Sequence, residues 1–420
     1  MVPGAMIGAA LAIVSRAHGG DPYLCPLLPA VGAAALSIGG VETYGQTVGL
    51  MQDTFRPRTY WWGALGLFAK GGLWFGIAGA LVSLVLGVRV LWAADVARLT
   101  LSACLAAAVG KRLLNHPLRA PDRYPLIYFS RRATCPEDWD TNRPRQEYWG
   151  GLLFGLLTIL IYSYVAFPYH PGLYVMALAG FLGGGAGFAV GEMLQAWGRW
   201  HAPFGDRVQP WIDWWKVMEM SFGLIAGAAL GLGFYLAFGH IPRLPAPALP
   251  ASWPWTIAAA WLIIAVAAAN GCRPASRLRD VPMLSGLALI AGLCGSLMVA
   301  TALVWGFVFY ASAQANLGRW RPQMSPRAYW LWHALLAVAS LVAGLAGMGA
   351  ARRWGGDPRA LLLALALSQT ALTVSHALAE QESGGFRARL ARMKAPLTVP
   401  AGFLLLCGAL WWVSTALVRR

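Results

Sequence analysis

Charged residues are scarce in this chain. Lys, Arg, Asp and Glu make up 12% of its 420 residues, whereas hydrophobic residues make up 58%. A typical soluble domain carries about 25% charged residues. Apolar runs recur along the chain, and many reach the roughly 20 residues that a helix needs to cross a bilayer. The shortage of charge therefore excludes an ordinary soluble protein and predicts an all-α fold, a polytopic transmembrane helix bundle.

Acidic residues are the scarcer of the two signs, because 17 acids face 33 Lys and Arg for a net charge of +16. In a soluble protein such an excess would favour nucleic-acid binding. Here most basic residues lie in short connections between apolar runs, where cytoplasmic loops and anionic lipid head groups account for them. We therefore expect the lipid bilayer as a partner and no nucleic acid.

Cysteine is also rare, and its pattern excludes several kinds of site. The six cysteines are scattered without a CxxC pair, and no HExxH, phosphate-binding loop or haem-attachment motif occurs. Asp138 and Asp140 are one residue apart, and two carboxylates at this spacing can bind Mg²⁺ or Mn²⁺. The favoured explanation is a solvated acidic turn, because so short a motif often arises by chance. The sequence thus indicates no cofactor and only these two weak metal candidates.

The apolar runs predict eleven or twelve spans, and the open case is the short run at 3–15. Connections on one side carry more Lys and Arg, which places the C-terminus and the 111–148 segment in the cytoplasm of an inner-membrane, multi-pass protein. The expected domains are a first bundle (1–110), a cytoplasmic connecting segment (111–148), a second bundle (149–270) and a C-terminal bundle (271–420). The other expected spans are 26–49, 62–86, 90–110, 150–167, 172–195, 214–238, 254–270, 283–311, 328–350, 358–379 and 398–417.

Two stretches about 150 residues apart resemble each other. Phe75–Ala80 (FGIAGA) returns at Phe222–Ala228 (FGLIAGA) with one inserted residue, and both stretches follow a pair of tryptophans and a lysine. Glu42 and Glu192 each end a glycine-rich span. Because four spans separate the copies, they would form a parallel internal repeat. Chance similarity is the alternative in a chain with 49 glycines.

Glycines at a spacing of four mark helix faces that can approach a neighbour closely. Such columns begin at Gly72, Gly183 and Gly223. We expect all three to pack inside the bundle. The less favoured interpretation is a glycine-lined path or a broken helix near Gly183.

Charges inside apolar spans are the main functional candidates, because a charge at mid-bilayer costs at least about 2.5 kcal/mol on insertion scales. Asp95 and Arg98, three residues apart, are expected to neutralise each other. Glu219 shares a helix face with Gly223, so we expect it to point inward and meet Glu192 in one cavity. Position near an interface is the competing explanation for several of them. The predicted substrate- or proton-binding residues are Glu42, Lys70, Glu192, Lys216 and Glu219.

Three functions fit these features. The first is a permease for a small polar or charged solute, in which intramembrane acids converge at mid-depth. The second is a membrane-embedded transferase for a lipid-linked or acyl substrate, with carboxylates at head-group level beside a lateral cleft. The third is a non-catalytic assembly subunit. The permease is favoured; whether the protein is an enzyme, its substrate and its oligomeric state stay open.

Overall fold

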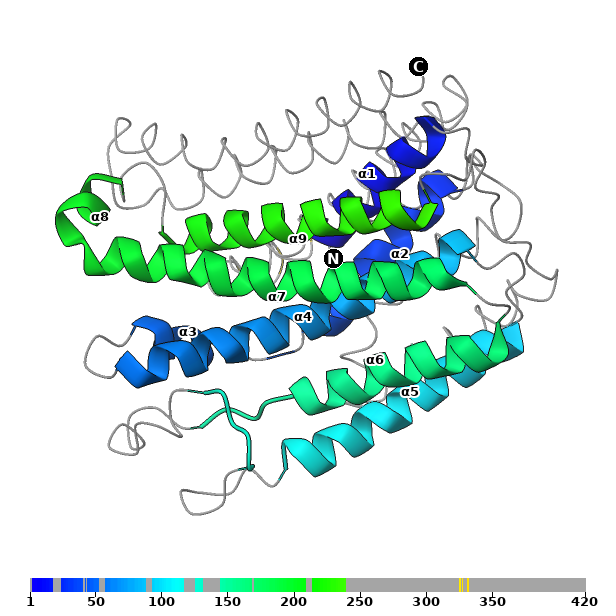
Figure 1. Ribbon diagram of the computed structural model, residues 1–420, viewed down its shortest axis with the longest axis horizontal. Helices are drawn as coiled ribbons and strands as arrows, with labels where there is room; N and C mark the ends of the chain where they lie inside the picture. Colours follow the sequence, from blue (N-terminus) through cyan, green and yellow to red (C-terminus); the bar gives the residue numbers. More distant parts are fainter. Residues whose placement is uncertain are drawn as a thin grey trace. The chain divides into compact units, whose positions relative to one another are not determined.

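The computed structural model describes residues 2–17, 24–40, 42, 44–52, 57–87, 93–116, 125–130, 144–167, 170–208 and 214–238, together with the isolated residues 325, 327 and 331. Within these ranges the chain is helical and has no strand, which confirms the all-α prediction (Figure 1). The last five expected spans, from 254 onward, lie outside the described residues.

The helices of the described ranges follow the expected spans closely. Four of them are long and apolar enough to cross a membrane: α4, α6, α7 and α9, with the candidate span of α4 starting at Thr59. Their bounds match four predicted spans within a few residues. The helices in chain order are α1 (Val2–Ala17), α2 (Leu24–Gly39), α3 (Gly45–Gln52), α4 (Pro57–Gly87), α5 (Ala93–Leu114), α6 (Trp149–Ala166), α7 (Pro171–Trp200), α8 (Ala202–Val208) and α9 (Trp214–Phe238).

The predicted span 26–49 is broken in the structure. Helix α2 ends at Gly39 and α3 begins at Gly45, so Glu42 lies in a bend and not inside a helix. The Glu42 amide donates to the Gly39 carbonyl at 3.3 Å, and the Thr47 amide starts α3 by donating to Tyr44 at 2.9 Å. The cause is local, because consecutive glycines at 39 and 40 make it easy for the chain to leave the helix.

The described chain separates into two compact units. The first contains Met1–Ala34, Arg89–Ala93 and Ile241–Arg420, and the second contains Ala35–Val88 and Ala94–His240. Within the second unit, α7 lies between α4 and α9 and contacts both (Figure 1). Helices from the predicted first and second bundles therefore pack together directly. The boundaries expected at 110, 148 and 270 stay predictions.

Glycines on α4 and α7 allow these close contacts. A Cβ atom on Gly72 of α4 would lie 2.9 Å from the Phe181 carbonyl oxygen of α7. A Cβ on Gly187 of α7 would lie 2.8 Å from the Phe222 carbonyl oxygen of α9. Real Cβ atoms do not come this close to another residue's atoms, so only glycine permits the observed spacing. The packing interpretation of the Gly72 and Gly183 columns is confirmed.

The third glycine column, on α9, does not face α4 or α7. A Cβ atom on Gly223, Gly227 or Gly231 would meet no atom within 4 Å in the described part of the chain. Helix α9 instead packs through the face that carries Met218, Phe222 and other buried residues. Each step of one residue turns the helix by about 100°, so the two series face different directions. This column therefore does not pack on α4 or α7, and its packing elsewhere in the bundle stays a prediction.

Candidate functional site

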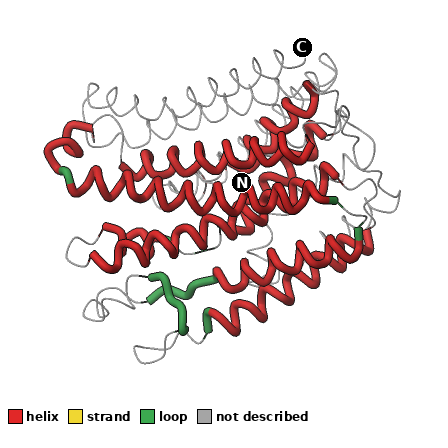
Figure 2. The backbone as a smooth tube through the Cα atoms, viewed as in Figure 1, coloured by secondary structure: helices red, strands yellow, loops and turns green. Residues whose placement is uncertain are grey.

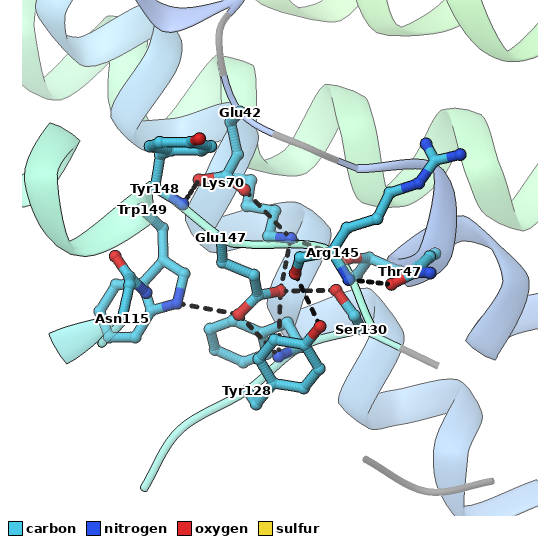
Figure 3. Close-up of polar contacts among 12 residues, drawn as sticks. Glu42, Thr47, Lys70, Asn115, Tyr128, Ser130, Arg145, Glu147, Tyr148 and Trp149 are labelled. Atoms are coloured by element: carbon cyan, nitrogen blue, oxygen red, sulfur yellow. Dashed lines mark hydrogen bonds and ion pairs between the residues drawn. The ribbon is translucent and has the colours of Figure 1, made fainter. Parts of the chain in front are cut away.

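Lys70 of α4 is buried among polar groups, with a relative exposure of 1%. Its ammonium lies 2.7 Å from Glu147 Oε1 and 3.4 Å from Glu42 Oε1, and it donates to Thr47 Oγ1 at 2.9 Å (Figure 3). Because a buried charge is tolerated only when it is paired and hydrogen-bonded, these contacts explain how α4 accommodates a lysine. We call Glu42, Thr47, Lys70, Ser130 and Glu147 the Lys70 cluster.

Glu147 is the charged residue of this cluster that the sequence interpretation missed. It is 1% exposed and lies two residues before α6. Its carboxylate accepts hydrogen bonds from the Phe129 amide at 3.1 and 3.2 Å, from Ser130 Oγ at 3.0 Å and from the Trp149 indole at 3.2 Å. Glu147 falls at the end of the 111–148 segment that the sequence predicts to be cytoplasmic. The sequence feature that could have identified Glu147 is its position two residues before the apolar run that forms α6.

The segments 125–130 and 144–148 bring Glu147 to Lys70 without regular structure (Figure 2). The Trp62 indole of α4 donates to the Tyr128 carbonyl at 3.0 Å, and the Tyr128 hydroxyl donates to the Arg145 carbonyl at 2.7 Å. The Tyr148 amide donates to Glu42 Oε2 at 2.7 Å. Non-helical backbone at membrane depth is tolerated only where protein or a water-filled cavity surrounds it. The parts of these segments nearest Lys70, at 128–130 and 147, meet that condition because they are buried against α4.

The position of this cluster along the helices follows from α4 and α6. The 18 residues of α6 rise about 27 Å, close to the roughly 30 Å of a hydrocarbon core. Glu147 lies two residues before α6, whereas Lys70 lies eight residues beyond Trp62 of α4, or about 12 Å along the helix axis, so the Lys70 cluster is set inward from the tryptophans. Tryptophans at 61, 62, 197, 200, 214 and 215 stand at the corresponding ends of α4, α7 and α9, as expected at a membrane interface.

Glu192 forms a second cluster on α7, and its relative exposure is 0%. Gln52 Nε2 of α3 donates to Glu192 Oε1 at 2.7 Å. The Gln195 amide satisfies its neighbours when its nitrogen donates to Glu192 Oε2 at 2.7 Å and its oxygen accepts from Arg199 Nη2 at 3.2 Å. Arg199 Nη1 also donates to Gln52 Oε1. We call these four residues the Glu192 cluster.

Lys216 and Glu219 form a third, much more exposed group. Their side chains are 51% and 42% exposed and bond to each other, and the Trp215 indole donates to Glu219 Oε1 at 2.8 Å. The described structure shows no contact between Glu219 and Glu192. The expected inward orientation of Glu219 is therefore not observed, because α9 turns this residue away from its face on α7.

The structure thus pairs four of the five predicted site residues, the buried Glu42 with Lys70 and the exposed Lys216 with Glu219, and Glu192 lies apart from both pairs. Asp95 and Arg98 form the expected pair at 3.6 Å. Asp138 and Asp140 lie outside the described residues. Among the described residues, no group of three or more His, Cys, Asp or Glu side chains is arranged to hold a metal ion.

These features describe an α-helical chain with several helices able to cross a membrane and two buried polar clusters near one end of them. Comparison with protein-family models, with curated proteins and with solved structures finds no match. Function is therefore argued from the clusters themselves.

Proposed function

We propose that the protein is a permease for a small polar or charged solute, and that the Lys70 cluster closes one end of its pathway. The observation that carries the proposal is the burial of Lys70 between two carboxylates, each of which comes from a break in helical structure. Transporters commonly combine interrupted helices with paired intramembrane charges. Glu42 lies in the break between α2 and α3, and Glu147 ends the irregular segment before α6.

The short and irregular segments around the cluster support a closing role. A buried salt bridge can open when the segments that carry its partners separate. Thr47 and Glu42 lie on or next to the short helix α3. A shift of α3 or of the segment before α6 would expose Lys70 to water and open this end.

Helix directions support the finer expectation of a parallel repeat. Gly72 and Gly79 of α4 face Phe181 and Met176 of α7 in reverse order, so α4 and α7 are antiparallel. The contacts of Gly187 and Gly191 with Phe222 and Met218 make α9 antiparallel to α7 as well. The two helices that carry the related strings therefore run in the same direction. We keep eleven or twelve spans and an inner-membrane location as parts of the same proposal.

A membrane-embedded transferase is the second candidate. The feature that favours it is the position of three carboxylates (Glu42, Glu147 and Glu192) in the half of the helices that carries the tryptophans of α4, α7 and α9. In this alternative the clusters would bind the polar part of a lipid-linked or acyl substrate. The enclosure of Glu147 and Glu192, at 1% and 0% exposure, favours the permease, because an enzyme of this kind needs a carboxylate that the substrate can reach.

The test is transport by purified protein in liposomes that enclose a pH-sensitive dye. Amino acids, organic acids, sugars and polyamines are added outside, one class at a time, and both radiolabelled solute and internal pH are followed. We expect one class to enter and Lys70→Met to change its rate strongly, with Lys216→Met as the exposed control. Absence of transport for every class, together with turnover of a lipid-linked or acyl donor, would establish the transferase instead.

A further inference from the structure

The Glu192 cluster forms a closed set of hydrogen bonds around one carboxylate. Gln52 and Gln195 each donate through the amide nitrogen to a different oxygen of Glu192, and each amide oxygen accepts from Arg199. Arg199 is exposed, whereas Glu192 is fully buried. The two glutamines therefore connect a buried anion to a cation at the end of α7 without a direct ion pair among the described residues.

This arrangement shows which contacts depend on the charge of Glu192. Both carboxylate oxygens act as acceptors, so the cluster as built suits the ionised form of Glu192. Hydrogen bonds to an ionised acceptor are roughly twice as strong as neutral ones. A proton added to Glu192 would occupy one oxygen, remove the charge and weaken both amide contacts.

The surroundings contain few groups that could take that proton instead. From α4, Tyr60 lies close enough for the Glu192 charge to affect its hydroxyl. From α9, the Met218 backbone faces the neighbouring Gly191, while Lys216 and Glu219 bond to each other on the exposed face. From α3 the neighbour is the uncharged Gln52, and on α7 it is Arg199. Glu192 is the buried acid among these described residues, whereas Glu219 is exposed and paired with Lys216.

We infer that Glu192 is a proton-binding site and that its protonation detaches α3 from α7. The proton comes from water near Arg199 and bonds to one oxygen of Glu192. The Gln52 amide then donates to a neutral acceptor, which makes a weaker hydrogen bond. Helix α3 spans only Gly45–Gln52 and also carries Thr47, which binds Lys70. Loosening of α3 at Gln52 would therefore also disturb the contact between Thr47 and Lys70. This inference rests on the contacts of α3 and α7 and does not require the permease function.

Infrared spectroscopy of the purified protein in lipid vesicles tests proton binding directly. Titration from alkaline to acidic buffer should produce the carbonyl band of a buried carboxylic acid in wild type and in Glu219→Gln. The same band should be missing in Glu192→Gln. A band that persists in Glu192→Gln, or that never forms in wild type, overturns the assignment.

Spin labels on exposed positions of the two helices test the movement. The native cysteines are replaced by serine, and labels are attached at Gly45→Cys on α3 and Leu194→Cys on α7, which are both exposed. We expect the label distance to increase or broaden on acidification, and Glu192→Gln to show the acidic distribution at every pH. An unchanged distance in wild type overturns the coupling of the proton to α3.

Gln52→Ala keeps the test decisive if Glu192→Gln does not fold. This variant removes the contact between α3 and α7 and leaves Glu192 in place. It should show the acidic label distance at neutral pH while retaining the carboxylic acid band on titration. A neutral-pH distance identical to wild type would contradict the role given to Gln52.

Discussion

The ammonium of Lys70 lies 2.7 Å from Glu147 Oε1, although 77 residues separate the two in sequence. This pair joins the middle of α4 to the segment that precedes α6, and Thr47 and Glu42 attach α3 and the preceding bend to the same point. The Lys70 cluster therefore connects four separate parts of the chain. Its loss should affect stability as well as function.

Lys70→Ala should destabilise the protein strongly. Removal of one partner of a buried ion pair leaves uncompensated buried charge and costs about 3–5 kcal/mol. Lys216→Ala is the matched control, because exposed pairs contribute only about 0.2–1 kcal/mol. Thermal unfolding in detergent should show a large drop for Lys70→Ala and little change for the control. Equal melting temperatures for Lys70→Ala and wild type would contradict the structural role of the cluster.

Gly187→Leu and Gly227→Leu should differ although both lie in glycine columns. A leucine at 187 would collide with the Phe222 backbone of α9, whereas position 227 has no described neighbour within 4 Å. Overpacking of a tight interface costs about 1–3 kcal/mol. We expect Gly187→Leu to lower the yield and melting temperature, and Gly227→Leu to retain both. The reverse order would show that the packing face of α9 is misassigned.

Cysteine labelling should reveal the packing of the segment 125–130 on α4. Ser130 is 1% exposed and Leu126 is fully exposed, so a cysteine at 126 should react quickly and one at 130 slowly. The experiment uses a cysteine-free background in detergent with a water-soluble maleimide. Equal rates at the two positions under folding conditions would argue against the packed segment.

His170 should make stability depend on pH. Burial lowers the pKa of its imidazole, partly offset by a hydrogen bond with the Ser83 backbone. Because the folded state binds the proton less well than the unfolded chain, the stabilising contribution is complete above about pH 6.5 and is lost as pH falls toward the lowered pKa. Thermal unfolding should therefore show a decline on acidification that is smaller in His170→Gln. Replacement of the exposed His201 by Gln serves as the control and should leave the decline unchanged.

The orientation of the chain can be tested independently of the structure. A reporter inserted between 131 and 143, or fused after Arg420, should behave as cytoplasmic, since Lys and Arg are in excess on that side. Enzymatic reporters active on only one side of the membrane measure this in cells. Labelling of the inserted site by a reagent confined to the outside would reverse the assigned orientation.

Local patterns predicted the helices well. The apolar runs placed α4, α6, α7 and α9 within a few residues of their bounds, because a membrane-spanning helix must satisfy its backbone internally and present apolar side chains along its length. Glycine spacing also identified two of the faces used for packing. The same pattern did not decide which face of α9 meets α7, since α9 carries small residues on one side and buried aromatic residues on another.

Partners of the buried charges could not be obtained from the sequence. Lys70 was recognised as a charge in an apolar run, but Glu147 belonged to a polar segment that composition assigned to solvent. Glu192 was recognised, while its partners Gln52 and Arg199 were not. Composition alone determined that this chain is helical and built for a membrane, because those properties follow from each residue's own hydropathy. Only the tertiary structure decided which charges meet, because hydrogen bonds and ion pairs depend on distances between groups that are far apart in the sequence and that folding alone brings together.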